Sequence, residues 1–509
     1  MRGARPDSAA ALPVALRPAV WLPAAWLLAA WLLVGAAWPG AARAQADPVP
    51  YGVVSLSVTG QAFDQLLPWI KATERSVSGN AVVVEGHKLV TTADLVKAAN
   101  LIEVRKFGRY PDYPARALLV DYEQNLALLT VDDPEFWVGL RPLPLAPRPV
   151  PSGHFAINRW RSNGRFERGT GEVVDFVVGT SPFGLLEFPI LRATTAVGGL
   201  GWSEVLTSEG EVIGLITSHD GQQLRATPSD RLRLLVEAAG REPFGGFAHR
   251  GFAWQQLNQE HLRASLGLQA SDTGVLVRRV FHGGTGAAEL RAEDILHRVN
   301  GYDVDPEGRI EHPTYGLMLF TVAFNESLAP TLPVEIERAG KRMRLELKRL
   351  RFDADDYRIP PPQFGSANDY EAFGGLVLQE LSVSYLQAWG GEWRNKAPAR
   401  LVIEYGMHPM REPEAAPERV VFISRVLPDP SNLGYGDVDN AIVRSVNGRP
   451  LRSLADFREA IRHPREGYHE IELLPGAGRG MLVFRQSELA AINARVRTRY
   501  GIPARDAAR

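Results

Sequence analysis

The chain has 509 residues, of which 45% are hydrophobic and 23% charged, and its 57 lysine and arginine side chains nearly balance 58 aspartate and glutamate side chains. This is the composition of a globular protein with about three domains. The near-neutral charge, and the lack of a basic segment interleaved with aromatic residues, argue against nucleic acid as a partner. Because the sequence contains no cysteine, disulfides and thiol chemistry are excluded.

The first 46 residues have the features of an export signal. Arginines at positions 2, 5 and 17 precede an apolar run from Ala19 to Trp38, and Ala-Arg-Ala follows at residues 42–44. We expect cleavage near Ala44 and a periplasmic location in a bacterium. The alternative is an uncleaved N-terminal membrane anchor, since a run of about 20 apolar residues can span a bilayer.

Residues 51–239 contain two series of short segments with alternating apolar side chains, separated by a proline-rich stretch at 141–153. Such a pattern is typical of two β-barrels joined by a connecting strap. We expect a helix at 229–239 to end this part of the chain. Residues 240–247, which are rich in glycine, would then serve as a linker.

An internal repeat follows the linker. Thr273–Phe281 leads to Ala292–Val304, and Arg419–Leu427 leads to Gly436–Leu451. In each pair a strand ending in Arg-Val precedes a strand that closes on Val-Asn-Gly. The Asn-Gly pair predicts a tight hairpin turn in both copies, because both residues tolerate positive φ. A helix with Leu489, Ile492 and Val496 on one face is expected near the C-terminus.

Three segments resemble the trypsin-like protease domain of the HtrA/Deg family: GNAVVVEGHKLVTTADLV at Gly79–Val96, DYEQNLALLTV at Asp121–Val131, and GGLGWSEVL, which precedes GEVIGL at Gly210–Leu215. The two repeats resemble PDZ domains. The likeness is greatest to the Deg branch that has an expanded second PDZ domain and a tail containing YGIP. It implies a mainly β fold, in which a trypsin-like double β-barrel is followed by two PDZ (α+β) domains.

The resemblance implies six parts of the chain. We expect a signal peptide at 1–46, a degenerate protease domain at 51–239, a first PDZ domain at 248–350, a linker at 351–362, a second PDZ-like domain at 363–487, and a C-terminal helix and tail at 488–509.

In the register of the family, Asp94, Asn125 and Gly201 stand at the positions of the catalytic His, Asp and Ser. A serine hydroxyl is a poor nucleophile until an imidazole takes its proton, and the imidazole needs a carboxylate to hold its tautomer. None of the three roles is filled, so we expect the protein to be inactive as a protease, with Asp94 serving as a helix N-cap. The alternative is a displaced site that uses His87 and Ser203.

A PDZ domain binds a peptide as an added strand at a sheet edge, while a loop of backbone N–H groups receives the C-terminal carboxylate. The candidate loop of the first domain is Gly251, Phe252, Ala253 and Trp254. In the second domain the candidates are Gly374, Gly375 and Leu376, which follow Phe373. An ordinary turn that opens a strand is the alternative for both.

These features favour an exported pseudoprotease that binds unfolded proteins or C-terminal peptides through its PDZ domains. Two alternatives stay open, namely an active serine endopeptidase of periplasmic protein quality control with a displaced site, and a regulatory partner of an active HtrA protease. The family also implies a homo-oligomer, a trimer or a multiple of one. We expect no cofactor and no metal, because the sequence lacks the corresponding motifs.

Overall fold

The structure is a computed structural model that describes residues 47–503 apart from 242–245, 270–271, 408, 413–417 and 477. The expected signal peptide and parts of the linker and tail lie outside the described residues. Among those described, no helix is both long and apolar enough to cross a membrane.

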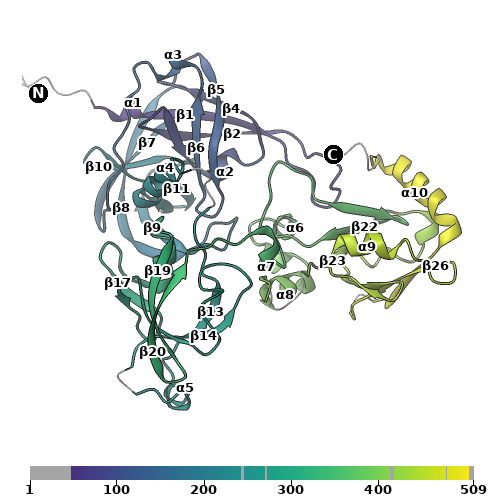
Figure 1. The fold of residues 1–509 in the computed structure, drawn as a ribbon. Coiled ribbons are helices and arrows are strands. Elements are labelled where there is room, and N and C mark those ends of the chain that lie inside the picture. Colours follow the sequence, from purple (N-terminus) through teal and green to yellow (C-terminus); the bar gives the residue numbers. More distant parts are fainter. Residues whose placement is uncertain are drawn as a thin grey trace, which may run out of the picture. The chain divides into compact units, whose positions relative to one another are not determined.

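The first half of the chain folds into two closed barrels of six antiparallel strands (Figure 1). The first has the strand order β1-β2-β3-β6-β5-β4. Its strands are β1 (Val53–Gly60), β2 (Arg75–Val84), β3 (Lys88–Thr91), β4 (Ala99–Arg105), β5 (Asp112–Asp121) and β6 (Leu126–Val131), with short helices α1 (Val49–Gly52), α2 (Ala93–Val96) and α3 (Pro134–Trp137).

The second barrel has the order β10-β11-β12-β9-β8-β7. Its elements are β7 (Gly153–Trp160), β8 (Phe166–Gly179), β9 (Phe188–Thr195), β10 (Val205–Ser208), β11 (Glu211–Asp220), β12 (Gln223–Pro228) and helix α4 (Ser229–Ala238). The helix predicted at the end of this region is thus present.

Alternation along the strands explains how one sequence fills two cores. In β2, Ala81 and Val83 point into the core of the first barrel, whereas Val82 and Val84 join a cluster that includes Leu232 and Leu235 of α4. Successive side chains of a strand point to opposite faces, so one buried strand can serve both clusters.

The next part of the chain, which we call the first module, has a sheet of order β13-β14-β15-β19-β20, with β16 paired to β15. Its elements are β13 (Phe252–Gln255), α5 (Glu260–Ser265), β14 (Val275–Val280), β15 (Ile295–Val299), β16 (Tyr302–Asp303), β17 (Arg309–His312), β18 (Gly316–Leu319), the 3-10 helix η1 (Phe320–Phe324), β19 (Thr331–Arg338) and β20 (Lys341–Lys348).

The remaining part, the second module, has one sheet of order β21-β22-β23 and one of order β25-β24-β26-β27. Its elements are η2 (Ala354–Asp356), β21 (Tyr370–Phe373), β22 (Leu376–Glu380), α6 (Val383–Gln387), α7 (Trp393–Lys396), α8 (Ala399–Met407), β23 (Val421–Val426), η3 (Pro430–Asn432), β24 (Val443–Val446), β25 (Arg449–Pro450), α9 (Leu454–Ala460), β26 (Tyr468–Leu473), β27 (Met481–Arg485) and α10 (Gln486–Tyr500).

Two local predictions for the modules are confirmed. Asn300-Gly301 and Asn447-Gly448 both have positive φ at the two turn positions and connect paired strands. Leu489, Ile492 and Val496 are buried on α10.

The segment between β1 and β2 contacts the second module. Trp69 lies there, its indole Nε1 donates to the Tyr500 carbonyl at 3.1 Å, and its ring packs on Tyr370 with centroids 5.3 Å apart. Leu67 joins the same cluster, which includes Val377 of β22. Residues from Pro48 onward therefore form one compact unit.

Candidate functional site

The structure brings Asp94 and Asn125 together. The backbone N–H of Asp94 donates to Asn125 Oδ1 at 2.8 Å, and Asn125 is buried in a turn at φ 54°, a conformation that asparagine tolerates. The carboxylate of Asp94 pairs with Lys97. Thr92, rather than Asp94, is the N-cap of α2, so that prediction is wrong, although the N-terminal turn of the helix does contain Asp94.

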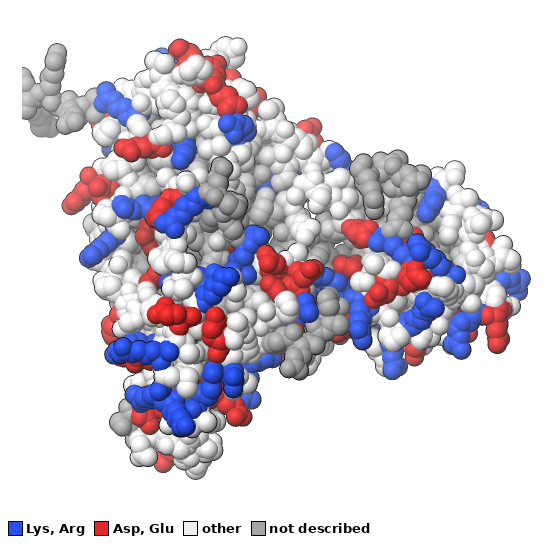
Figure 2. Space-filling view, viewed as in Figure 1, with Lys and Arg blue, Asp and Glu red and all other residues white. Residues whose placement is uncertain are grey.

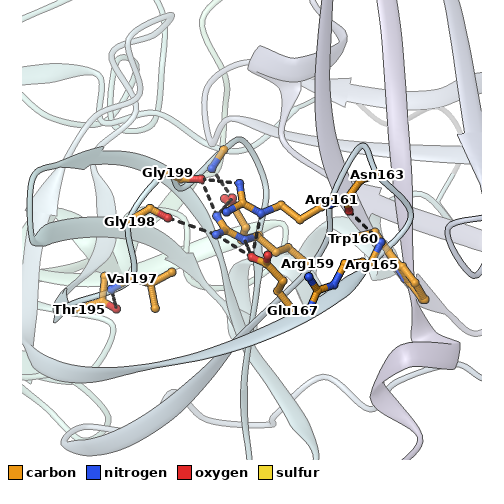
Figure 3. A network of polar contacts seen from close by, with 12 residues as sticks. Arg159, Trp160, Arg161, Asn163, Arg165, Glu167, Thr195, Val197, Gly198 and Gly199 are labelled. Atoms are coloured by element: carbon orange, nitrogen blue, oxygen red, sulfur yellow. Dashed lines mark hydrogen bonds and ion pairs between the residues drawn. The ribbon is translucent and has the colours of Figure 1, made fainter.

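A buried arginine, Arg159, holds the loop that precedes Gly201 in place at Gly198 and Gly199 (Figure 3). Arg159 donates to the carbonyls of Gly199 at 2.6 Å and of Gly198 at 3.2 Å. Its guanidinium also lies 3.4 Å from Glu204 and 3.0 Å from Glu167. The side chains of Arg159 and Glu204 are 5% and 1% exposed, so this ion pair is shielded from water.

The backbone N–H of Gly201 donates to the carboxylate of Glu204. In a serine protease the backbone N–H of the nucleophile is one of the donors that stabilise the oxyanion. At the position that the family register assigns to the nucleophile, this donor is already bound to an internal anion. A substrate carbonyl could use it only by displacing Glu204.

Ser203 lies in a cluster of threonines. Its Oγ accepts from the backbone N–H of Thr92 at 2.8 Å, donates to Thr92 Oγ1 at 2.7 Å and lies 3.0 Å from Thr91 Oγ1. Ser203 is fully buried and has φ 57°. The hydroxyl is therefore fixed by local structure and contacts threonine instead of an imidazole.

His87 lies in the exposed turn between β2 and β3, at φ 56°. Its ring stacks on Trp137 with centroids 4.8 Å apart and planes 11° apart. The structure does not bring His87 into hydrogen-bond contact with Ser203, since the recorded partners of Ser203 Oγ are the two threonines.

Asp94 and Lys97 face a recess made of two adjoining cavities of about 730 and 690 Å³, and Trp202 lines both. Gly201 instead lines a separate cavity of about 460 Å³ with Arg159. Among the described residues that line the recess there is no histidine. Its wall combines further residues of the barrels with residues of α6, α7 and the 357–366 segment, so this recess is bordered by the second module.

The sequence analysis missed Trp202, Glu204 and Arg159. Trp202 is 40% exposed, so a large aromatic side chain stands directly after the position that the family register assigns to the nucleophile. A tryptophan and a glutamate within a run of small residues were the signal in the sequence. The partner Arg159 lies 45 positions away from Glu204 and could not be paired with it by spacing.

Two neighbouring carboxylates, the buried Asp121 and the half-buried Glu123, lie four and two residues before Asn125. Asp121 Oδ1 accepts the backbone N–H groups of Glu123 at 2.8 Å and Gln124 at 3.2 Å, while its buried Oδ2 has no hydrogen-bond partner. Burial, reinforced by the charge of Glu123, raises the pKa of Asp121 to about 7.

Glu123 links three parts of the chain. Its carboxylate accepts the N–H groups of Leu185 and Leu186, each at 2.9 Å, and lies 3.4 Å from His249 Nε2. Although burial alone would raise the pKa of Glu123, the contacts with His249 and the two backbone groups lower it below the usual value. The segment before β9 is thus bound to the start of the first module.

In the first module, Phe252, Ala253 and Trp254 lie on β13, which is the edge strand of its sheet. Gly251 precedes it, donates to Thr285 O at 2.9 Å, and has backbone atoms so close that a Cβ would lie 2.8 Å from that oxygen. Glycine is therefore required there. Phe252 is buried, and Trp254 is half-buried against another aromatic ring.

In the second module, Gly374 and Gly375 form the two-residue turn between β21 and β22, both with positive φ. The N–H of Gly374 donates to Asn493 Oδ1 of α10 at 2.8 Å, and Leu376 is fully buried. Strand β22 has β21 on one side and β23 on the other. Neither side of β22 is therefore free for an added peptide strand.

Comparison with known proteins places these parts in a family. The model of a PDZ domain matches residues 359–508. Protease Do-like 2 of Arabidopsis thaliana, a chloroplast protein, is 25% identical over 82% of this chain and 68% of its own length. Putative mitochondrial protease Do-like 12 of the same plant is 23% identical over 80% of this chain and 77% of its own. The chain belongs to the HtrA/Deg family.

Among solved structures, the HtrA-type protease AlgW with a decapeptide aligns with 60% of this HtrA/Deg chain and 97% of its own, at a TM-score of 0.44 and 18% identity. The two closed barrels confirm the trypsin-like fold class predicted from the sequence, and the PDZ match confirms a C-terminal PDZ domain.

Proposed function

We propose that this HtrA/Deg-family protein is a pseudoprotease, which binds peptides or unfolded chains through its first PDZ domain and does not cleave them. The observation that carries the proposal is the hydrogen bond between the Gly201 N–H and the Glu204 carboxylate. A developing oxyanion would meet a resident anion there, and removal of one oxyanion donor alone costs about 100- to 1000-fold in turnover.

The surroundings of the other two positions support the same conclusion. Asp94 pairs with Lys97, and Asn125 uses its side-chain oxygen on a backbone N–H. An acid–base role needs a group that can take a proton from a nucleophile within hydrogen-bond reach. Ser203 donates to and accepts from threonine, which cannot act as that base.

The binding function is supported by the first PDZ domain, whose edge strand β13 has a neighbour on one side. Peptide addition to such an edge needs a free row of backbone groups. On the face that Figure 2 shows, basic and acidic side chains are intermixed. We further propose export to the periplasm and assembly into a homo-oligomer, on the grounds of the N-terminal sequence and the family.

The test combines hydrolysis and capture in one set of samples. Wild-type protein, the Ser203→Ala variant and trypsin as a positive control are incubated with fluorescent casein and with a serine-directed fluorophosphonate. We expect no cleavage and no label with the wild type, together with binding of reduced, unfolded lactalbumin in a pull-down. Cleavage or labelling that is lost in Ser203→Ala would refute the proposal.

A further inference from the structure

The recess that Asp94 and Lys97 face is built mostly by residues outside the positions of a catalytic triad. Of the three positions in the family register, Asp94 alone is among the described residues that line it. The larger cavity, of about 730 Å³, is bordered by α6, α7 and the 357–362 segment. The other, of about 690 Å³, is bordered by β2 and by the 60–65 and 363–366 segments. The two cavities meet at the residues that line both: Asp94, Lys97, Trp202 and Gln387.

Aromatic rings line both cavities. Phe183 in the first and Phe364 in the second pack edge to face with ring centroids 5.3 Å apart, so one aromatic wall runs from one cavity into the other. Trp202, which is 40% exposed, stands where the cavities meet. Trp393 and Tyr405 line the first cavity further on and also pack edge to face. A recess of this size with aromatic walls is typical of a site for a small apolar molecule.

The charged groups of the recess are mainly cations. Among the described lining residues Asp94 is the one carboxylate, and Lys97 already pairs with it. The guanidiniums of Arg394 in the first cavity and of Arg75 in the second are therefore the unbalanced charges. The lining as a whole thus favours a ligand that carries negative charge.

Arg394 is the cation that is held in a defined orientation. Its guanidinium lies over the ring of Trp393, 4.4 Å from the ring centroid, and within the described part of the chain it forms no ion pair. A stacked guanidinium presents its N–H groups sideways as a planar fork, which matches the two oxygens of a carboxylate. Arg394 is therefore placed to bind an anionic group at the end of the first cavity.

We propose that the recess binds a fatty acid, with its carboxylate on Arg394 and its hydrocarbon chain along Phe183 and Trp202 toward the second cavity. An apolar, aromatic lining with excess positive charge fits a ligand that joins a long apolar body to a single anionic group. A neutral or cationic amphiphile would leave the fork of Arg394 unused. The site is separate from the first PDZ domain, so the proposal does not depend on peptide binding by that domain.

The test uses the full chain and isothermal titration calorimetry with three probes of equal chain length, namely sodium decanoate, decanol and decyltrimethylammonium. The variants are Arg394→Gln and Trp202→Ala. The matched controls lie outside the recess: Arg141→Gln, whose exposed guanidinium lies 5.2 Å from the centroid of the Tyr51 ring, and Tyr468→Ala, whose side chain is on a residue 39% exposed. Circular dichroism checks that each variant is folded. Because Arg394 is exposed, its variant keeps the test decisive even if Trp202→Ala does not fold.

We expect the wild type to bind decanoate about tenfold more tightly than decanol, and decyltrimethylammonium more weakly than either. Arg394→Gln should weaken the binding of decanoate about 10- to 100-fold and leave that of decanol within about twofold, because it removes the charged partner alone. Trp202→Ala should weaken the binding of both about tenfold, since it removes apolar surface where the two cavities meet. The two controls should match the wild type.

Four results would contradict the proposal. Equal affinities for decanoate and decanol would show that the site does not recognise a carboxylate. Unchanged affinity for decanoate in folded Arg394→Gln would remove the assigned partner of the acid, and unchanged affinity in folded Trp202→Ala would place the ligand outside the recess. If a C-terminally amidated peptide rich in phenylalanine and glutamate displaces decanoate and binds more tightly than it, the recess serves a polypeptide instead of a fatty acid.

Discussion

The pKa of the buried Asp121 offers a quantitative test of its environment. The rise of its pKa from 3.8 to about 7 means that the folded protein keeps a proton that the unfolded chain loses. Stability should therefore fall as the pH rises from 3.8 to about 7 and stay level above it. Each pKa unit is about 1.4 kcal/mol, so the two units between pH 5 and 7 amount to about 3 kcal/mol.

The substitution Asp121→Asn removes this titration and keeps the Oδ1 acceptor for the N–H groups of Glu123 and Gln124. We expect the free energy of unfolding of the variant, relative to the wild type, to increase by about 3 kcal/mol between pH 5 and pH 8. In addition, the free energy of unfolding of the variant should be lower by about 1–3 kcal/mol at every pH. The reason is that the buried Nδ2 donor takes the place of an oxygen that has no hydrogen-bond partner.

The assay is urea denaturation followed by tryptophan fluorescence at pH 5, 6, 7 and 8. Asp132→Asn is the control, since the Asp132 side chain is 72% exposed and pairs with an exposed arginine on the same barrel. His249 is present in both proteins, but its charge, which lowers the pKa of Asp121, acts on this carboxyl group in the wild type alone. If the pH profiles of Asp121→Asn and the wild type run parallel, the account of a buried, protonated Asp121 is wrong.

Three further predictions concern contacts in different parts of the molecule. Arg159→Met should lower the free energy of unfolding by about 3–5 kcal/mol, since it leaves the buried carboxylate of Glu204 without its cation. A thermal midpoint within about 2 °C of the wild type, which corresponds to about 1 kcal/mol or less, would contradict this. Trp69→Ala should speed hydrogen exchange in β21 and α10 without changing it in β13, as mass spectrometry would show. The Asp429 side chain is fully buried, and its hydrogen bond with Arg495 lowers its pKa. Arg495→Met should therefore destabilise the protein at pH 7, and the difference from the wild type should disappear as the pH falls below 4 and Asp429 becomes protonated; calorimetry at both pH values measures it.

The fold could be predicted in large part because its signals are local. The alternating apolar residues in β20 and the Asn-Gly turns at 300 and 447 are set by period-two side-chain direction and by backbone conformation. The barrels and the repeated modules follow from such short-range patterns. The resemblance to the HtrA/Deg family supplied the identity of the domains and their order along the chain, whereas the order of the strands in each sheet comes from the structure.

The site was less accessible to prediction because it depends on pairs far apart in the chain. The family register assigned Asp94 and Asn125 to two positions of one triad, and the structure brings them into contact. The bonds of Arg159 to Gly199 and Glu204 instead depend on how strand β7 meets the loop before β10. The turn at Gly374 was predicted as a peptide-binding loop. Its N–H group is instead bound by Asn493, which lies 119 residues later and carries no motif.

The central claim is that the protease fold of this HtrA/Deg protein does not form an acyl-enzyme. Labelling of the wild-type protein with a fluorophosphonate, beside Ser203→Ala and active trypsin, tests it most directly, because the reagent reports an activated serine without the need for a known substrate. We predict no labelled serine by mass spectrometry of the folded protein. Stoichiometric labelling of Ser203 would contradict the account and would show that its threonine cluster can open to an imidazole.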